Sequence, residues 1–460
     1  MKLTAVLCVL LCSPNFLPAE MYQVGSTDEL RQLLKSKSIV AGDEIVWADG
    51  EYDQVDINLS GVNGEPGYPI VLRAETPGGV VFTGDSRLRI GADHAVVSGF
   101  HFKATCGSTL PDKVIAFRGT GGDFANFSRL TNVVIEEADP GHPVLRKSKW
   151  VVLYGQFNRV DHCYFSGKRS HDNLMTVYLD ESSEQLPAYH QIDHNYFANR
   201  ADGALAGGTT NGWEIIRIGD SKTSLQEALC RVEANYFERC SGEIEVISNK
   251  SGSNVYLGNA FVECSGQLTL RHGFGCLVVD NVFIGSPKNS AEESGVRIVG
   301  PDHTVVGNAF LNLDGEGTRG AIVLTEGVRD GLINEYEPVT NALIRANVII
   351  DCRSPIVVGA LHGRKAKHAK VNDVPPSSVS IDGNVIVGSS LVFQYFGDSA
   401  PGISFSNNVA FTPFSSVEIP WEDEASKGFV AFPLLAADVD RKGIQDRADF
   451  IRQKSGPEWR

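Results

Sequence analysis

Apolar residues along this chain occur in short Val-, Ile- and Phe-rich runs that Gly, Asp, Asn and Pro interrupt. The stretch IVAGDEIVWADGEY (39–52) is an example, and this pattern is typical of strands joined by tight turns. Helical periodicity is scarce. One short helix is predicted within STDELRQLLKS (26–36), where Ser26 and Glu29 have the spacing of a capping box.

The second half of the chain repeats one pattern, in which an apolar strand precedes an Asn and a second apolar strand follows it. Examples are HQIDHNYFAN, VYLGNAFVEC and TVVGNAFLNL. Successive anchors are 40, 24, 22, 27, 39, 37 and 24 residues apart, a period near 22–27 that insertions lengthen. The anchors are Asn195, Asn235, Asn259, Asn281, Asn308, Asn347, Asn384 and Asn408.

A repeat of this length indicates a solenoid, because one coil cannot bury its inner face alone and stacking supplies the core. A recurrent Asn at a β corner tolerates the left-handed conformation and can hydrogen-bond its equivalent one coil away. A β-sandwich, the alternative, does not hold such a period. We therefore predict an all-β fold, a single right-handed parallel β-helix over residues 20–460 with the short N-terminal helix as a cap. Residues from about 409 to 460 lose the pattern and are expected to pack on it as an irregular segment.

Residues 1–19 combine an early cation, Lys2, with an apolar run, which predicts a secretory signal peptide cleaved after Ala19. Export to the periplasm or the medium is expected. No later apolar run reaches the roughly 18 residues that a membrane span needs, so a membrane partner is not expected. The net charge of −15 argues against nucleic-acid binding, since phosphate contacts require a basic face. An acidic polymer could still bind in a locally basic groove, with a metal.

Seven cysteines follow the predicted leader, at irregular spacing and in odd number. This is not a disulfide framework, and the absence of CxxC argues against a zinc ribbon. We expect most of them to be small buried residues, with one pair able to form a bridge. The sequence does not indicate an oligomeric state.

Candidate chemistry lies in SGEIEVISNKSG (241–252). Glu243 and Glu245 are two apart in a predicted strand, so both side chains point to one face. A divalent cation would relieve their repulsion, and Ca²⁺ prefers such oxygen ligands. Alone, such a pair is more often solvated surface glutamates than a metal site.

The neighbouring coils add polar residues at matching positions. NGWEIIRIGDS (211–221) carries Asn211 and Glu214, and GQLTLRHGFG (266–275) carries Arg271. With a coil of 24 residues, Arg271 is expected beside position 247, on the same face as both glutamates. Arg297 follows one coil later. Spacing leaves two interpretations open, a metal-competent site and a mixed outer face.

At these residues the chain resembles polysaccharide lyase family 6, which comprises β-helical alginate lyases and chondroitinase B. NGWE, E-x-E, N-K-S and L-R-H-G occur in the family's order, and the resemblance covers most of the chain beyond residue 19. It implies calcium on Asn211, Glu243 and Glu245. It also implies Lys250 as the base and Arg271 as the second catalytic group.

The resemblance implies β-elimination across a 4-linked uronic acid. Calcium would neutralise the C6 carboxylate, and Lys250 would remove the C5 proton. The amine must be neutral for this step, which favours a neutral to alkaline optimum. Because a guanidinium holds its proton tightly, Arg271 is expected either to act as the acid or to orient substrate while water supplies the proton.

Other residues have less certain roles. Arg297 is expected to bind a substrate carboxylate, His272 to bind substrate or belong to the core, and Glu214 to add an oxygen, orient Asn211 or remain a plain surface residue. Further residues that could line subsites are Lys168, Arg169, His171 and Tyr336.

The predicted function is therefore that of an exported, calcium-dependent alginate lyase, whose partner is an acidic polysaccharide. Dermatan sulfate is the alternative substrate, for which LHGRKAKHAK (361–370) could supply basic groups unless it is a solvated loop. A pectinase-like hydrolase or a non-catalytic binding β-helix would have no use for Lys250 and Arg271 beside the carboxylates.

Overall fold

The computed structural model describes residues 19–460, except 104–110, 138–141, 180–185, 209, 287–291, 367–369, 390, 398–401, 413–428 and 434–439. All of the predicted signal peptide but Ala19 lies outside the described residues, as does Cys106. No helix in the described ranges is long and apolar enough to cross a membrane.

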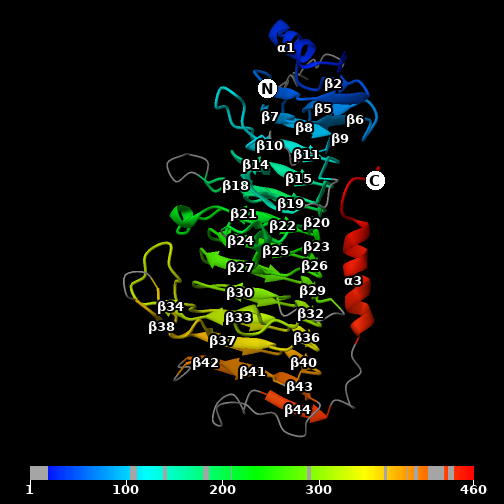
Figure 1. The fold of residues 1–460 in the computed structure, drawn as a ribbon. Helices are drawn as coiled ribbons and strands as arrows, with labels where there is room; N and C mark the ends of the chain where they lie inside the picture. Colours follow the sequence, from blue (N-terminus) through cyan, green and yellow to red (C-terminus); the bar gives the residue numbers. More distant parts are fainter. Residues whose placement is uncertain are drawn as a thin grey trace, which may run out of the picture.

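Three long sheets, which we name A, B and C, wind around one core, and each coil contributes a strand to each sheet (Figure 1). The pairing within all three is parallel. Sheet A contains β1 Met21–Val24, β2 Glu44–Trp47, β5 Ile70–Ala74, β8 Ala95–Ser98, β11 Arg129–Thr131, β15 Arg159–Asp161, β19 Gln191–Asp193, β22 Arg231–Glu233, β25 Val255–Leu257, β28 Leu277–Val279, β31 Thr304–Val306, β35 Leu343–Arg345, β39 Val379–Asp382 and β42 Ile403–Ser406.

Sheet B contains β3 Gly50–Asp53, β6 Val80–Thr83, β9 Phe100–Lys103, β12 Val134–Glu136, β16 Tyr164–Ser166, β20 Tyr196–Arg200, β23 Tyr236–Cys240, β26 Ala260–Val262, β29 Val282–Ile284, β32 Ala309–Leu311, β36 Val348–Ile350, β40 Val385–Val387, β43 Asn408–Thr412 and β44 Phe429–Pro433. Sheet C contains β4 Asp56–Ser60, β7 Arg87–Gly91, β10 Lys113–Ala116, β14 Lys149–Leu153, β18 Met175–Val177, β21 Ile216–Ile218, β24 Glu245–Lys250, β27 Gln267–His272, β30 Val296–Ile298, β33 Ile322–Thr325, β37 Ile356–Ala360 and β41 Phe393–Tyr395. The predicted right-handed parallel β-helix is confirmed.

Short elements decorate the coils. Two small sheets pair β13 Val144–Lys147 with β17 Ser170–His171, and β34 Gly327–Val328 with β38 Asn372–Val374. Single turns of 3₁₀ helix are η1 Gly203–Ala206, η2 Ser221–Thr223 and η3 Gly317–Arg319. The loops that carry η1, β34 and β38 project from the side of the molecule on which sheet C lies (Figure 1).

Helix α1, Thr27–Ser36, closes the N-terminal end of the core as predicted. The Ser26 hydroxyl accepts a hydrogen bond from the backbone N–H of Glu29, and the Glu29 carboxylate accepts one from the N–H of Gly25. The side chain of Leu30 is 2% exposed and belongs to the core. Without this cap the apolar end of the solenoid would face water.

The repeated asparagines form a continuous ladder inside one corner. From Asn235 onward, each side-chain oxygen accepts hydrogen bonds at 2.8–3.0 Å from the backbone and side-chain N–H groups of the Asn one coil earlier. The predicted hydrogen bonding is confirmed. The members of this ladder, all of them buried, are Asn195, Asn235, Asn259, Asn281, Asn308, Asn347, Asn384 and Asn408.

The left-handed conformation, however, belongs to the residue before each ladder Asn. Examples are His194 at φ 54°, Ala234 at φ 52° and Ala346 at φ 52°. The prediction that the Asn itself turns the corner is therefore wrong. The ladder Asn must present both its backbone and side-chain groups along the stack, so the reversal of direction falls on its neighbour.

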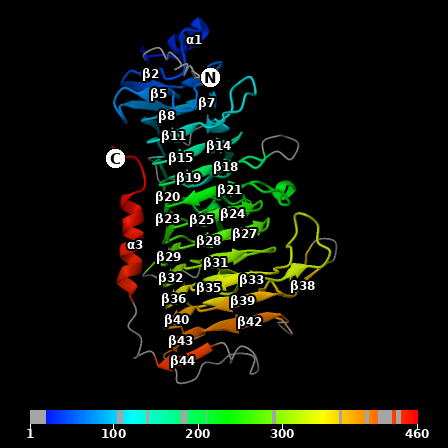
Figure 2. The same ribbon diagram turned by 180° about the vertical axis from the view of Figure 1, so that it is seen from behind.

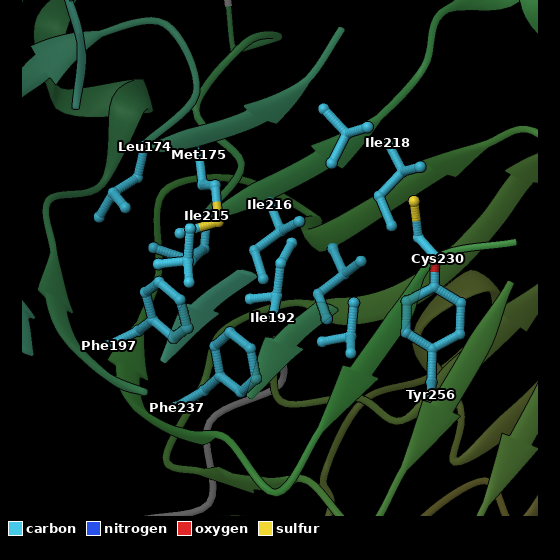
Figure 3. Packing of buried hydrophobic residues seen from close by; sticks show 14 of the residues in the cluster. Leu174, Met175, Ile192, Phe197, Ile215, Ile216, Ile218, Cys230, Phe237 and Tyr256 are labelled. Atoms are coloured by element: carbon cyan, nitrogen blue, oxygen red, sulfur yellow. The ribbon is translucent and has the colours of Figure 1, made fainter. Parts of the chain in front are cut away.

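Apolar side chains stack in the same coil-to-coil manner. Aromatic rings of sheet B face one another with centroids 4.6–5.2 Å apart. Phe197 and Phe237 of this stack pack against Ile192 and Ile216 (Figure 3). The six described cysteines are buried and free, as expected for most of them, and no described pair forms a bridge.

The end of the chain leaves the solenoid and returns along it. Helix α3, Arg441–Gln453, runs beside strands of sheet B in both views (Figures 1 and 2). Ala448 and Ile451 are buried against a cluster that includes Tyr236 and Leu311. The final residues reach the early coils, where Trp459 donates to the carbonyl oxygen of Asn132. This part of the predicted irregular segment is therefore a helix followed by an extended end. We call residues 441–460 the C-terminal strap.

Candidate active site

Three carboxyl groups gather where sheet C strands β21 and β24 begin. Glu243 accepts hydrogen bonds from the backbone N–H groups of Gly212 and Trp213, both at 2.8 Å. These bonds join the predicted ligand segment around Asn211 to the E-x-E segment. Burial, together with the charges of Glu214 and Glu245, raises the pKa of Glu243 to about 9.

Glu214 is only 1% exposed, so its alternative role as a plain surface residue is wrong. Its carboxylate accepts a hydrogen bond from the side-chain amide of Asn173 and lies against the Glu243 carboxyl group. Burial and the charge of Glu245 raise its pKa. Asn173 was not anticipated, because it lies one coil before Glu214 and no sequence motif marks it.

These oxygens suit a hard cation. Glu243 uses one carboxylate oxygen for backbone N–H groups and Glu245 uses one for Arg297, at 2.6 Å, which leaves one oxygen on each side chain for a metal. Although three carboxyl groups lie near one another here, within the described residues no group of three His, Cys, Asp or Glu side chains is arranged to hold a metal ion. The predicted set of two carboxylates and the Asn211 amide is consistent with this, since water and substrate oxygens complete such sites.

The segment of Asn211 is held by His171. The His171 ring donates from Nε2 to the backbone carbonyl oxygen of Asn211 at 2.9 Å, and its centroid lies 5.2 Å from that of Trp213. His171 therefore positions the segment rather than lining a subsite. Lys168 is fully buried and donates to the carbonyl oxygens of Ser170, at 2.7 Å, and of His171, so it too is internal scaffolding.

Lys250 and Arg271 meet at the far end of the same strands. Lys250 ends β24 and pairs in register with His272, while Arg271 is an extra residue in β27. A second extra residue, Val246, lies in β24. Both are β-bulges.

The bulges correct the predicted register. Ile247 pairs with Leu268, not Arg271, and Ile247 points into the core although it has the sequence parity of Glu245. Because Val246 adds one residue, Glu245 faces outward and Ile247 inward. Arg271 is nevertheless brought to the outer face near Lys250, since the positive charges of both lower the pKa of His272.

His272 is 4% exposed and its Nε2 lies 3.3 Å from the Ser221 hydroxyl. Burial first, then the charges of Arg271 and Lys250, lower its pKa to about 3, so the ring is neutral at physiological pH. Arg297 is also 4% exposed and is paired with Glu245. Both side chains therefore support neighbouring groups, and neither is placed as a free cation for a substrate carboxylate.

Tyr336 covers Arg271. The Arg271 guanidinium lies 4.0 Å from the ring centroid, and that of Arg364 lies 5.5 Å from it. Burial raises the pKa of Tyr336, but the charges of Arg297 and Arg271 and a hydrogen bond from Arg364 outweigh it and the net shift is downward. Arg364 therefore lies beside the site while remaining exposed to solvent, as expected for a solvated loop. The sequence alone did not indicate that the loops carrying Tyr336 and Arg364 lie beside Arg271.

Polar atoms without partners collect on the outer face between these groups. Among the described residues, the buried atoms without a hydrogen-bond partner include Nη1 of Arg271, Nε of Arg217 and Nε of Arg297. The hydroxyls of Ser248 and Thr269 share this property, and the register places both in one row with Arg217 and Arg297. Burying a polar group without a hydrogen-bond partner lowers the stability of the fold unless water or a ligand supplies that partner. These residues therefore indicate a polar surface for ligand binding, which we call the polar floor. Ser248 and Thr269 were missed because isolated hydroxyl residues in a strand carry no signal.

The sequence model of the Chondroitinase B family matches residues 24–420. Among solved structures, an arginine mutant of the PL6 family alginate lyase AlyGC is 32% identical with a TM-score of 0.81, over 96% of this chain and 59% of that one. The present chain thus spans about three fifths of that protein. A mannuronic acid specific family 6 lyase from human gut microbiota is 31% identical with a TM-score of 0.81, over 96% of this chain and 97% of that one.

The family 6 lyase Pedsa3628 from Pseudopedobacter saltans shares the fold at 23% identity and a TM-score of 0.71, over 95% of this chain and 99% of that one. Among curated protein sequences none matches. The extent of the family match and the identity over nearly full length agree with the motifs NGWE, E-x-E, N-K-S and L-R-H-G. The chain belongs to the chondroitinase B family, polysaccharide lyase family 6.

Proposed function

We propose that this protein is a calcium-dependent alginate lyase that cleaves by β-elimination. The observation that carries the proposal is the polar floor beside Lys250, where unpaired donors of Arg271 and Arg217 adjoin a buried carboxyl cluster. A polyuronate offers the carboxylate and hydroxyl oxygens that such donors need. A hydrolase would instead need a carboxylic acid facing a water across the scissile bond.

Lys250 is the proposed base. It removes the proton from C5 of the uronate, the electron pair of that bond forms the C4–C5 double bond, and the C4–O4 bond breaks as O4 takes up a proton. Calcium held by Asn211, Glu243 and Glu245 would neutralise the C6 carboxylate and so make the C5 proton more acidic. Arg271 stabilises negative charge with its unpaired Nη1.

Tyr336 is the better candidate for the proton donor to O4. Its hydroxyl group belongs to a ring that lies directly over the Arg271 guanidinium, and the lowered pKa makes it a stronger acid than an ordinary tyrosine. A guanidinium gives up its proton reluctantly, which disfavours Arg271 in this role. Arg271 then acts by orienting substrate and by favouring the phenolate that remains.

Alginate is the proposed substrate because one similar structure is that of a PL6 family alginate lyase, AlyGC, and another, matched over nearly its whole length, is described as a mannuronic acid specific family 6 lyase. Dermatan sulfate remains the second candidate. The family name and the contact between Arg364 and Tyr336 favour it, since a sulfated chain calls for an extra cation at the site.

Ultraviolet absorbance of unsaturated uronate tests the proposal. The protein is mixed separately with alginate and dermatan sulfate, with and without a chelator. A signal on alginate that chelation removes is expected, and a signal on dermatan sulfate alone would reverse the substrate. Lys250→Ala should lower the rate at least about a hundredfold with unchanged thermal stability. Chain shortening without the absorbance signal would refute elimination.

A further inference from the structure

The outer face of sheet C continues beyond the site toward the N-terminal coils. The register pairs Val152 with Thr176, Thr176 with Arg217, and Arg217 with Ser248, which forms one outward row. The residues two positions further on form a second row, most of which lies just past the ends of these strands. The backbone pairing continues there, since the N–H of Tyr178 donates to the carbonyl oxygen of Leu153 and the N–H of Gly219 to that of Val177. In order from the N-terminal side, this second row is Arg118, Tyr154, Tyr178, Gly219 and Lys250.

Ring contacts confirm the alignment of the second row. The Tyr154 and Tyr178 centroids are 5.1 Å apart, and the Arg118 guanidinium lies 5.7 Å from the Tyr154 ring. Lys250 therefore lies in line with the side chains of Arg118, Tyr154 and Tyr178. Four coil spacings of about 4.8 Å separate Arg118 from Lys250, a distance of about 19 Å. Figure 1 shows the strands concerned, β10 to β24, following one another down this face.

A hollow of about 330 Å³ lies at the distant end of the row. Its lining includes Arg87, Arg89, Lys113 and Arg118 but a single acid, Asp112. Three of these cations have partners, since Arg87 and Arg89 pair with Asp56 and Lys113 pairs with Asp112.

Arg118 differs from its neighbours. In the described part of the chain no carboxylate pairs with it, and its guanidinium is held over the rings of Phe124, at 5.1 Å, and Tyr154. Aromatic faces orient a guanidinium without neutralising it, so the charge is available to an anion from outside. On a chain of net charge −15 this is a local exception.

The surface between the hollow and Lys250 has no side chain at Gly219 and an exposed aromatic ring at Tyr178. Gly219 has no side chain, and a Cβ there would lie 3.1 Å from the carbonyl oxygen of Lys250. Tyr178 is 47% exposed, which presents a ring to solvent two coils from Lys250. An exposed ring in line with an unpaired cation suits a sugar chain that carries carboxylates.

We propose that Arg118, Tyr154 and Tyr178 form a second binding site for the anionic polysaccharide, four coils from Lys250. Arg118 takes a uronate carboxylate above the Tyr154 ring, and Tyr178 stacks on a sugar ring nearer the site of cleavage. The inference rests on the proposed function for the identity of its ligand. It assigns a direction to the bound chain, along the axis of the β-helix.

Binding is tested in the Lys250→Ala background, so that polymer is not cut. The double variant Arg118→Ala, Tyr178→Ala should bind polymannuronate or polyguluronate about tenfold more weakly in affinity electrophoresis. The matched control is Arg231→Ala on sheet A, an exposed arginine paired with Glu233, which should bind as its parent does. Thermal unfolding of each variant checks that the fold is retained.

Kinetics with Lys250 restored give a second readout. The ratio of KM for polymer to KM for a trisaccharide should rise about tenfold in the double variant, because a trisaccharide is too short to engage Lys250 and Arg118 together. An unchanged ratio and unchanged binding would overturn the site, as would a parent that binds neither polymer. If the parent binds polymer through Arg118 but yields no unsaturated product, the lyase proposal fails and the site stands.

Discussion

At the scale of single residues, the protonation of Glu243 would link the proposed calcium binding to pH. Its carboxyl group shares a buried corner with those of Glu214 and Glu245, and its pKa of about 9 keeps it protonated at neutral pH when no cation is present. A metal ligand must be deprotonated. Calcium binding at Glu243 therefore has to displace a proton.

Calcium affinity should accordingly rise about tenfold between pH 7 and pH 8, because one proton is released per ion below the pKa of Glu243. Isothermal titration calorimetry at both pH values, in two buffers of different ionisation enthalpy, measures the affinity and the proton count. Glu243→Gln should abolish the release. Equal affinity at both pH values would show that Glu243 is not a ligand.

Tyr336 provides a second test at this scale. Tyr336→Phe keeps the ring over Arg271 and removes only the hydroxyl group, so kcat should fall about a hundredfold with little change in KM. Steady-state rates on alginate measure both constants. A variant with wild-type kcat would return the proton donor role to Arg271 or to water.

At the scale of elements, the Asn ladder explains how coils of different length keep one register. Asn281 receives hydrogen bonds from Asn259 and donates to the carbonyl oxygens of Tyr256 and Val279 while fully buried. Insertions can lengthen a coil because they leave this corner unchanged.

Asn281→Ala should lower the free energy of unfolding by about 2–4 kcal/mol, since it removes the buried acceptor of the backbone and side-chain N–H groups of Asn259. Urea denaturation measures the change. The control, Asn334→Ala, removes an exposed side chain and should stay within about 0.5 kcal/mol. Equal effects would mean that the ladder is not stabilising.

The strands around the site were only partly predictable. The two glutamates do come together, but the prediction that both lie in one strand was wrong, because β24 begins at Glu245 and Glu243 lies in the bend before it. L-R-H-G indicated a residue near Lys250. The bulges at Val246 and Arg271 were invisible, because a bulge is set by how two strands pair and not by the composition of either. For this reason the predicted partner of Arg271 was wrong although its face was right.

At the scale of the whole molecule, the C-terminal strap ties distant coils together. Several of its hydrogen bonds use carbonyl oxygens of corner residues in the left-handed conformation. Arg447 donates to Asp280, Ser455 to Ala234, and the backbone of Gly456 to His194. These carbonyl oxygens therefore bind a segment that follows the solenoid in sequence.

Ile451→Ala should destabilise the protein by about 2–4 kcal/mol, because Ile451 is 7% exposed and packs with Ala448 against sheet B. Its neighbour Phe450 is 60% exposed, so Phe450→Ala is the control and should change stability little. Denaturation of both variants measures the difference. A larger loss for Phe450→Ala would indicate that α3 packs through its other face.

The sequence by itself determined the repeat, the Asn ladder, the capping helix and the identity of the site's charged groups, because each is encoded locally, by periodicity or by a contiguous motif. The tertiary structure alone decided which side chains meet. Lys168 is buried, Tyr336 and Arg364 come to Arg271 from inserted loops, and the row from Arg118 to Lys250 exists only after four coils stack. Contacts between residues of different coils and loops depend on loop paths and on strand pairing. Neither is recorded in the spacing of any one segment.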